Sequence, residues 1–281
     1  MPTPFELLNS SGDRISGNIH LPQSPAHSPS PVVVICHGFK GFKEWGFFPH
    51  IAETFAQHGF SAIRFNFSHN GVEDDSDCFT RLDLFTRNTF GKELEDLGAV
   101  LDSIEKGALP HSAQLNPEQI AILGHSRGAV ATLLEGPRHS GVRALATWGG
   151  ISDCQRWDEE TRRHWREQGQ LLVSNVRTSQ QMPIDVSVLD DLEAHPEEYD
   201  ILSHVQNLAI PFLVVHGDED ETVPFSEALL LHDATPRGLR KLQLIPGAGH
   251  TFGAVHPFKG SSESLEDALR ATIEWFQLRL H

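Results

Sequence analysis

Short apolar runs alternate along the chain with longer segments in which apolar residues recur every three or four positions. The run from Val32 to Cys36 is continuous and rich in β-branched residues, as in a strand that a parallel sheet buries on both faces. The segment from Asn88 to Lys106 has the helical repeat instead. Its apolar positions are Leu94, Leu97, Val100, Leu101 and Ile104. This alternation predicts an α/β fold, in which helices cover both faces of a mostly parallel sheet.

The same pattern places the other elements and predicts a sheet of about eight strands. Two short extended segments, Phe5 to Leu8 and Arg14 to Leu21, flank the turn-rich residues Asn9 to Asp13 and predict an N-terminal hairpin. Further strands are expected at residues 60–66, 120–123, 144–148, 211–216 and 240–245, and further helices at residues 51–58 and 264–280.

The strand predicted at residues 120–123 runs directly into a Gly-x-Ser-x-Gly motif. The motif is Gly124-His125-Ser126-Arg127-Gly128, and a helix-compatible run of Ala, Val and Leu follows it. A strand, a sharp turn and a helix in this order are the pattern of a nucleophile elbow, which projects its serine from the sheet edge. Side chains two residues before and after Ser126 would collide, so glycine is expected there. The motif is short enough to arise by chance, so its interpretation depends on an acid and a base elsewhere.

Two later segments carry the acid and the base that such a serine needs. Asp218 and Asp220 follow the predicted strand at residues 211–216, and His250 lies in a glycine-rich loop after the strand at residues 240–245. The carboxyl ends of parallel strands meet at one edge of the sheet, where open α/β sheets build their sites. The chain order serine, acid, histidine is that of α/β-hydrolases. It predicts a catalytic triad with either Asp218 or Asp220 as the acid.

On these motifs the chain resembles the α/β-hydrolase superfamily, and within it the bacterial carboxylesterases of the cinnamoyl and feruloyl esterase type. The matching segments are His37-Gly38-Phe39-x-Gly41, Gly124-His125-Ser126-x-Gly128, His216-Gly217-Asp218-x-Asp220-x-x-Val223-Pro224 and Gly249-His250. The resemblance implies the α/β-hydrolase fold with a mostly parallel central sheet, and a serine carboxylesterase activity without cofactor or metal. The segment Asn66 to Gly71 departs from the family pattern Asp-x-x-Gly-His-Gly, which leaves the contacts of that loop open.

The resemblance also implies roles for the acidic residues and histidines. It selects Asp220, four residues before Pro224, as the acid that orients His250. Asp218 would instead brace its loop through hydrogen bonds to the backbone. Two further histidines, His37 and His125, would hold the loops of their own motifs.

The expected reaction is ester hydrolysis through an acyl-enzyme. His250 would take the proton of Ser126, which attacks the acyl carbonyl. The backbone N–H groups of Phe39 and Arg127 would form the oxyanion hole. Three alternatives stay open: an acyltransferase on the same triad, a small peptidase on the same triad, and a non-catalytic protein of this fold that binds a ligand.

One stretch breaks the alternation of strands and helices. Residues 151–208 contain no convincing strand, and we expect two or three helices there that form a cap over the serine. The chain is thus expected to be a single domain, residues 1–281, with residues 151–208 as a helical cap insertion. Trp157 and Trp165 lie on one face of a predicted helix in the insertion. Packing against the core and contact with the substrate would explain them equally well.

The sequence says little about the substrate. Lys40 and the side chain of Arg127 could attract a carboxylated substrate, and we take Lys40, Trp157 and Trp165 as candidate substrate contacts. The first loop would suit an apolar acyl pocket, although its last two aromatic residues could simply seat the following helix. The aromatic residues of this loop are Phe39, Phe42, Trp45, Phe47 and Phe48.

The composition of the chain argues against several classes of partner and location, but it does not indicate a function. The formal net charge of −16 disfavours nucleic acids and anionic membranes as partners, because both select patches of Lys and Arg. No apolar run approaches the ~18 residues that span a membrane, and the first residues lack the features of a secretory signal. Three cysteines are an odd number without metal-like spacing. We expect a cytoplasmic protein that acts on a small-molecule ester; a homodimer is compatible with the sequence.

Overall fold

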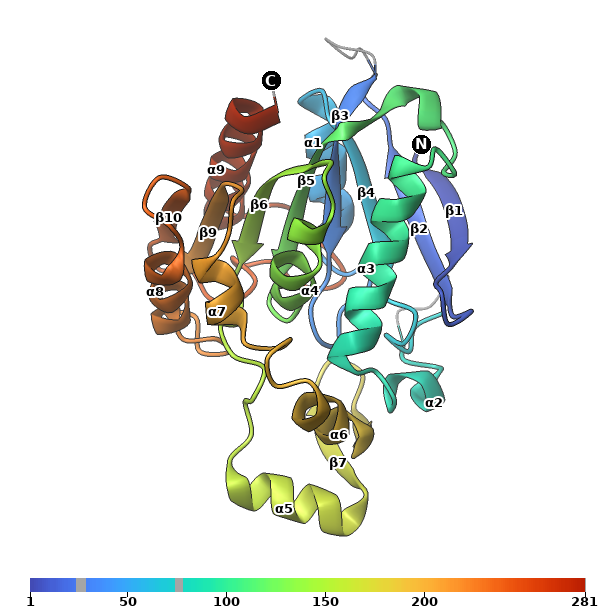
Figure 1. The fold of residues 1–281 in the computed structure, drawn as a ribbon, viewed down its shortest axis with the longest axis vertical. Coiled ribbons are helices and arrows are strands. Elements are labelled where there is room, and N and C mark those ends of the chain that lie inside the picture. The colour runs from blue at the N-terminus through green and yellow to red at the C-terminus, as the bar shows by residue number, and fades with distance from the viewer. Residues whose placement is uncertain (24–28, 74–77, 281) are drawn as a thin grey trace.

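An eight-stranded sheet runs through the computed structural model, which describes residues 1–23, 29–73 and 78–280 (Figure 1). The strand order is β1-β2-β4-β3-β5-β6-β9-β10. β2 pairs with β1 and with β4 in antiparallel fashion, whereas the other neighbours are parallel. The predicted α/β class, the mostly parallel eight-stranded sheet and the N-terminal hairpin are confirmed.

Most strands and helices of this body lie where the hydrophobic pattern predicts them. The strands are β1 (Thr3–Leu8), β2 (Arg14–His20), β3 (Ser30–Cys36), β4 (Ser61–Asn66), β5 (Leu115–His125), β6 (Val142–Trp148), β9 (Phe212–Gly217) and β10 (Arg240–Ile245). The helices around them are α1 (Phe48–Gln57), α2 (Leu82–Phe85), α3 (Phe90–Glu105), α4 (Gly128–Leu134), α7 (Ile201–Gln206), α8 (Phe225–Ala234) and α9 (Glu263–Leu280).

The sheet is buried on both faces, and successive residues of its central strands face opposite layers. In β3, Val32 and Val34 pack in the core with α3, α4, α7 and α8, whereas Val33 and Ile35 pack with α1 and α9. This division follows from the strand period of two, which points successive side chains to opposite faces. All four side chains are buried, and each burial is worth about 1.5–3 kcal/mol of transfer free energy. The continuous apolar run thus encodes a central strand.

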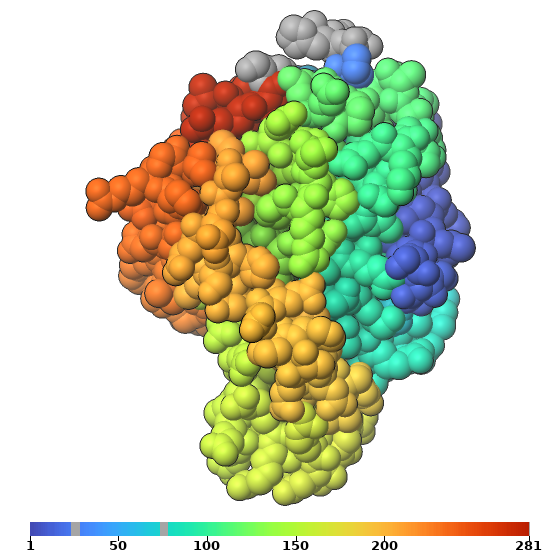
Figure 2. All heavy atoms as spheres, viewed as in Figure 1, coloured from blue at the N-terminus to red at the C-terminus, as the bar shows by residue number. Residues whose placement is uncertain are grey.

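The insertion at residues 151–208 is not wholly helical, so this expectation is wrong in part. It contains an antiparallel pair of strands, β7 (Gln170–Asn175) and β8 (Gln180–Asp185), beside the helices α5 (Glu159–Gln168) and α6 (Ser187–Ala194). These elements form a lobe that protrudes from one end of the body (Figures 1 and 2). The helix α7 packs on the body instead, because Ile201 and Val205 belong to the core on the α3 face of the sheet.

The two-stranded sheet escaped the sequence prediction because its alternation of polar and apolar residues is weak. In β7 the inner positions are Leu171, Val173 and Asn175, while Leu172 and Ser174 are exposed. An apolar residue therefore lies outside and a polar one inside, which hides the period of two that identifies a strand. The lobe has a small hydrophobic core, to which the body contributes Phe79 and Phe85. The residues of the lobe in this core are Trp165, Met182, Ile184, Val188 and Leu189.

Two of the three cysteines, Cys36 and Cys154, are buried thiols outside any disulfide. Burial raises the pKa of both thiols, that of Cys154 to about 12, so they stay protonated at neutral pH. Over residues 1–23, 29–73 and 78–280, no helix combines the length and the apolar character needed to cross a membrane.

Candidate active site

Ser126 sits in the sharp turn between β5 and α4, in the conformation of a nucleophile elbow. Its φ is 55°, in the left-handed region that residues with a side chain rarely adopt. Its N–H donates to the carbonyl of Trp148 on the neighbouring strand (2.9 Å), and its own carbonyl accepts from the N–H of Ala129 (3.0 Å). These hydrogen bonds hold a conformation that costs of order 1–3 kcal/mol, as strained residues at functional sites commonly do.

The two glycines of the motif are required by close packing, as predicted. A Cβ atom on Gly124 would lie 2.3 Å from Oγ1 of Thr132 and 2.6 Å from the carbonyl oxygen of Gly128. A Cβ atom on Gly128 would lie 2.6 Å from the carbonyl oxygens of Cys36 and His37. Because real Cβ atoms do not approach so closely, only glycine lets β5 and α4 meet at this angle.

The structure brings Ser126, His250 and Asp220 together in one hydrogen-bonded series. Nε2 of His250 lies 3.0 Å from Oγ of Ser126, and its Nδ1 lies 2.7 Å from Oδ2 of Asp220. The serine hydroxyl donates to Nε2, and Nδ1–H donates to the carboxylate, which fixes the tautomer of the ring. This is the geometry that a Ser–His–Asp triad needs.

The surroundings of Asp220 keep it ionised. Its side chain is completely buried, which opposes ionisation, but hydrogen bonds with His216 and His250 and from the N–H of Val223 hold its pKa well below the usual value. The second carboxylate, Asp218, accepts a hydrogen bond from the N–H of Gly247 (2.7 Å) and so braces the loop, as the resemblance implies.

His37 and His125 hold the loops around the site. Nδ1 of His37 donates to the carbonyl of Gly38 (2.9 Å), and its Nε2 accepts from the N–H of Phe67 (3.2 Å). Nε2 of His125 donates to the carbonyl of His250 (3.1 Å). Burial lowers the pKa of His37 to about 4 and that of His125 to about 3, so both rings are neutral at pH 7. These hydrogen bonds to the backbone agree with the expectation that both histidines hold the loops of their own motifs.

The loop with Gly38 and Phe39 lies directly against the elbow. A Cβ atom on Gly38 would come within 2.8 Å of Cβ of Ser126, and the turn closes through a hydrogen bond from the N–H of Gly41 to the carbonyl of Gly38 (2.9 Å). Arg127 follows Ser126 at the N-terminus of α4, where backbone N–H groups lack helical partners. The two segments expected to supply the oxyanion hole thus both lie next to Ser126.

Two cavities open beside Ser126, between the body and the lobe. The larger, of about 460 Å³, is mostly apolar. The smaller, of about 250 Å³, is also mostly apolar. Both are lined by Phe39, Lys40, Ser126 and His250. Ser126 can therefore be reached from either cavity.

Two of the three expected substrate contacts line these cavities, and the third does not. Lys40 lines both cavities, and Trp157 lines the larger one. Trp165 is fully buried in the core of the lobe, where its Nε1–H donates to the carbonyl of Ile184 (2.8 Å). The expectation for Trp165 is wrong because β8 covers the face of α5 that carries it.

The side chain of Arg127 is not available to a carboxylated substrate, contrary to expectation. Its Nε lies 3.0 Å from Oε2 of the buried Glu93, and its guanidinium also donates to the carbonyl of Asn88 (3.1 Å). The guanidinium lies 4.0 Å from the ring centroid of Phe90. Burial raises the pKa of Glu93 while Arg127 opposes this rise. The pair joins α3 to the elbow, and no local sequence signal connects residues 34 positions apart.

The aromatic first loop divides between the core and the site. Phe42 and Phe47 are fully buried in the core. Trp45 and Phe48 line the smaller cavity, and Phe48 also begins α1. The aromatic residues of this loop therefore do both things that the sequence left open: some pack in the core next to α1, and others line the site.

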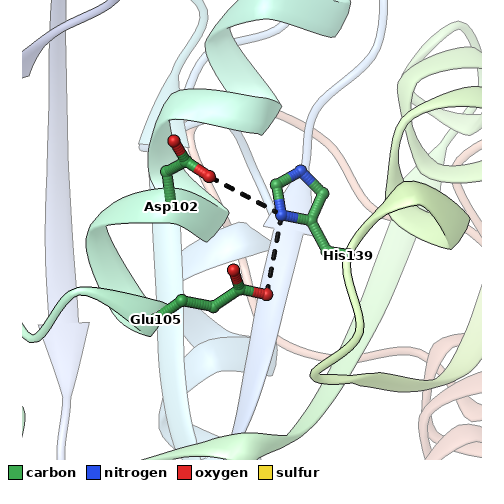
Figure 3. Close-up of side chains that lie close together, drawn as sticks. All are labelled: Asp102, Glu105 and His139. Atoms are coloured by element: carbon green, nitrogen blue, oxygen red, sulfur yellow. Dashed lines mark ion pairs between the residues drawn. The ribbon is translucent and has the colours of Figure 1, made fainter.

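A further group of polar side chains lies far from Ser126, at the other end of α3. Nδ1 of His139 lies 3.9 Å from Oδ1 of Asp102 and 3.6 Å from Oε1 of Glu105 (Figure 3). Asp102 is about 18 Å along α3 from Phe90 at the edge of the larger cavity. A hydrogen bond with Glu135, helped by the nearby carboxylates, raises the pKa of His139. Pairing of the imidazole with these carboxylates accounts for this group, and we assign no metal to it.

The chain matches known proteins over most of its length. The model of the prolyl oligopeptidase family matches residues 82–279. A 2,6-dihydropseudooxynicotine hydrolase of Paenarthrobacter nicotinovorans is 26% identical over 218 residues, which cover 74% of this chain and 48% of that protein. The chain therefore spans about half the length of this curated relative.

Solved structures share the fold along the whole chain. Est1E of Butyrivibrio proteoclasticus with bound ferulic acid superposes with a TM-score of 0.74 at 20% identity and covers 98% of both chains. A puromycin-hydrolysing peptidase of Mycobacterium tuberculosis has a TM-score of 0.67 at 20% identity, covering 99% of this chain and 39% of that one. At these identities the likeness concerns the fold. The predicted α/β-hydrolase fold and the resemblance to feruloyl esterases are confirmed.

Proposed function

Because the chain belongs to the prolyl oligopeptidase family and is a serine hydrolase, we propose that it hydrolyses carboxylic esters through an acyl-enzyme on Ser126. The observation that carries the proposal is the hydrogen-bonded series from Ser126 through His250 to Asp220, open to two cavities. The catalytic roles of these residues belong to the proposal. So do the small-molecule substrate, the absence of a cofactor requirement and the cytoplasmic location.

The first half-reaction acylates Ser126. Oγ forms a bond to the acyl carbon while its proton passes to Nε2 of His250, and the carbonyl electron pair moves onto oxygen. The backbone N–H groups of Phe39 and Arg127 stabilise this oxyanion, and losing one such donor typically costs about 3–4 kcal/mol. The ionised Asp220 stabilises the imidazolium. The tetrahedral intermediate then collapses, and Nε2 gives its proton to the departing alcohol oxygen.

The second half-reaction frees the acid. Water takes the place of the alcohol, His250 removes its proton as it attacks the acyl carbon, and Ser126 departs with that proton. Every step uses groups that the chain itself supplies.

The cavity walls favour an ester over a peptide with a free amino terminus. Among the described residues, neither Asp nor Glu lines the larger or the smaller cavity. A protonated amine would need such a carboxylate in a site shielded from water. An ester without a positive charge therefore fits the mostly apolar walls of the cavities better than such a peptide does.

The direct test is hydrolysis of p-nitrophenyl acetate and butyrate. We expect turnover by the native protein and loss of about 10⁴-fold or more in kcat for Ser126→Ala. Ser174→Ala, at an exposed position of β7, is the matched control and keeps the native rate. A fluorophosphonate probe should label the native protein and not Ser126→Ala. Unchanged turnover in Ser126→Ala would remove Ser126 from the mechanism, and no labelling of folded native protein would favour a non-catalytic binding protein.

The family match favours amide hydrolysis as the second candidate. Paired substrates with one acyl group, an anilide and a phenyl ester, separate the two activities. We expect kcat/KM for the ester to exceed that for the anilide by more than their difference in intrinsic reactivity. A protein that cleaves the anilide equally well is a peptidase. Product partitioning on addition of a competing alcohol would instead indicate an acyltransferase.

A further inference from the structure

We propose that Glu93 is a positioning residue for the oxyanion hole, which it holds in place through the side chain of Arg127. The inference rests on the proposed ester hydrolysis, because it concerns the backbone N–H groups of Phe39 and Arg127 assigned there to the oxyanion. Three observations support it: a buried network that joins α3 to the elbow, the contacts of the Arg127 guanidinium with the cavity wall, and the place of the Arg127 peptide beside Ser126.

The first support is the buried network between α3 and the elbow. Glu93 lies in the first turn of α3, and its Oε2 accepts a hydrogen bond from Nε of Arg127 (3.0 Å). Its Oε1 accepts from Nδ2 of Asn88 (2.8 Å), whose carbonyl in turn accepts from Nη2 of Arg127 (3.1 Å). The three residues are at most 7% exposed. Hydrogen bonds to charged groups are among the stronger ones, so this network fixes the direction of the guanidinium.

The second support is the position of the guanidinium near two aromatic rings. It lies 4.0 Å from the ring centroid of Phe90 and 5.7 Å from that of Phe39. Both rings line the larger cavity beside Ser126, as Arg127 itself does. Phe39 and Arg127 are the two residues whose N–H groups are assigned to the oxyanion. The network that Glu93 anchors therefore contacts both halves of the oxyanion hole.

The third support is the backbone that carries the Arg127 donor. The N–H of Arg127 directly follows Ser126, whose φ of 55° is strained. It lies at the N-terminal end of α4, where N–H groups lack helical partners. The bond to Glu93, 34 positions earlier in the chain, ties the Arg127 side chain to α3 and so restrains this peptide. Donors held in a fixed direction before the reaction are what make an oxyanion hole effective.

A purely electrostatic role of Glu93 makes the opposite prediction. Arg127 brings a positive charge to the cavity that contains Ser126, and the carboxylate of Glu93 opposes it. If opposing this charge were the only effect of Glu93, removing the carboxylate would strengthen the stabilisation of the oxyanion and raise kcat. If Glu93 positions the donor, its removal lowers kcat. The sign of the change therefore decides between the two roles.

Turnover of p-nitrophenyl acetate by Glu93→Gln measures this sign. Glutamine offers one acceptor oxygen where the network uses two, so either Asn88 or Arg127 loses its partner. We expect kcat to fall by about 10- to 100-fold while KM changes by less than about twofold. A displaced donor costs less than the 10²–10³-fold that the loss of a whole donor typically does.

Val100→Ala is the matched control for the stability of α3. Val100 is buried in the same helix, seven residues beyond Glu93, and its truncation weakens the packing of α3 without touching the network. Thermal unfolding shows at which temperature both variants are folded. At that temperature Val100→Ala should keep the native kcat.

A trifluoromethyl ketone supplies a second measurement that a merely structural role would not change. Oγ of Ser126 forms a bond to the ketone carbon, its proton passes to Nε2 of His250, and the carbonyl electron pair moves onto oxygen. The resulting hemiketal oxyanion resembles that of the transition state. We expect Glu93→Gln to raise the Ki of this inhibitor by about the factor by which it lowers kcat/KM.

Arg127→Met keeps the inference testable where Glu93→Gln does not fold. It removes the guanidinium, and Glu93, whose pKa burial already raises, can then stay buried as a neutral acid. This variant should also lower kcat and weaken binding of the ketone. In the double variant the losses should be no larger than in Arg127→Met alone, because Glu93 acts through Arg127. Additive losses would give Glu93 a separate effect and overturn the inference.

The outcomes separate the inference from the proposed function. Ester hydrolysis by the native protein with an unchanged or raised kcat in Glu93→Gln would overturn the inference and leave the esterase standing. Unchanged kcat and Ki in Arg127→Met would do the same. An equal fall of kcat in Val100→Ala would assign the loss to the stability of α3, against the inference. A native protein that neither hydrolyses the ester nor binds the ketone would overturn both the proposed function and the inference.

Discussion

Nδ1 of His250 lies 2.7 Å from Oδ2 of Asp220, although the two residues follow different strands. The adjacent strands β9 and β10 are parallel and in register, with Gly217 opposite Ile245. Asp220 is three residues beyond Gly217 and His250 five beyond Ile245. Two loops that leave neighbouring strand ends therefore meet, and the register of the sheet brings Asp220 and His250 into hydrogen-bond distance.

Replacing the acid should reduce turnover with little effect on the fold. Asp220→Asn keeps an oxygen for the N–H groups of Thr222 and Val223 but cannot stabilise the imidazolium of His250. We expect kcat on p-nitrophenyl butyrate to fall by about 10³–10⁴-fold. Asp218→Asn is the control, because its amide oxygen can still accept from the N–H of Gly247 and the side chain touches no reacting group. Equal losses in the two variants would contradict the assignment of Asp220.

The packing around the elbow predicts an unequal response of two glycines to alanine. Gly124→Ala places a Cβ atom 2.3 Å from Oγ1 of Thr132, whereas Gly238→Ala meets nothing within 4 Å. We expect Gly124→Ala to lower the free energy of unfolding by about 1–3 kcal/mol or more. Gly238→Ala should leave it unchanged or slightly raised. Thermal unfolding of both variants measures the difference, and equal midpoints would show that β5 and α4 are less tightly packed than described.

The two tryptophans of the insertion should have different consequences when truncated. Trp165→Ala empties the core of the lobe and should destabilise the protein by about 3–5 kcal/mol. Trp157→Ala removes a wall of the larger cavity and should mainly raise KM for esters with long apolar groups. Urea unfolding and an ester series of increasing chain length check the two effects. A stable Trp165→Ala protein with altered chain-length preference would restore Trp165 as a substrate contact.

The buried carboxyl group of Asp96 should make stability depend on pH. Burial raises its pKa to about 7, against hydrogen bonds from the N–H of Ser68 and from Nδ2 of Asn9. The folded state then holds a proton that the unfolded state has lost above about pH 4. Stability from this group is fully present below that pH and is lost as the pH rises to about 7, with a slope of up to about 1.4 kcal/mol per pH unit.

Urea unfolding of the native protein and of Asp96→Asn between pH 4 and 8 isolates this contribution. The difference in unfolding free energy between the two should decrease as the pH rises and level off above about pH 7. Asp153→Asn changes an exposed carboxylate, and its difference from the native protein should stay flat. A flat difference for Asp96→Asn as well would mean that Asp96 is ionised in the folded protein throughout.

The sequence alone determined those parts of the structure that depend on residues close together in the chain. The two faces of β3 follow from a continuous run in which successive side chains alternate. At the elbow, the need for glycine at position 124 is steric and local, since a Cβ atom there would meet Gly128 and Thr132 within a short stretch of chain. The need for glycine at position 128 comes instead from Cys36 and His37 at the end of another strand. The choice of Asp220 over Asp218 needed the family pattern, and the hydrogen bonds of the loop agree with it.

The tertiary structure alone decided which side chains reach the site from far along the chain. Arg127 is neutralised by Glu93 of α3, Trp165 is covered by β8, and Asn175 enters the smaller cavity on a strand whose pattern is too mixed to recognise. Each of these outcomes depends on packing between segments separated by many residues, and hydrophobic periodicity carries no information about such pairing. Contiguous residues therefore determined the elbow at Ser126 and the strand and helix beside it, whereas the walls of the two cavities were settled by how the lobe packs on the body.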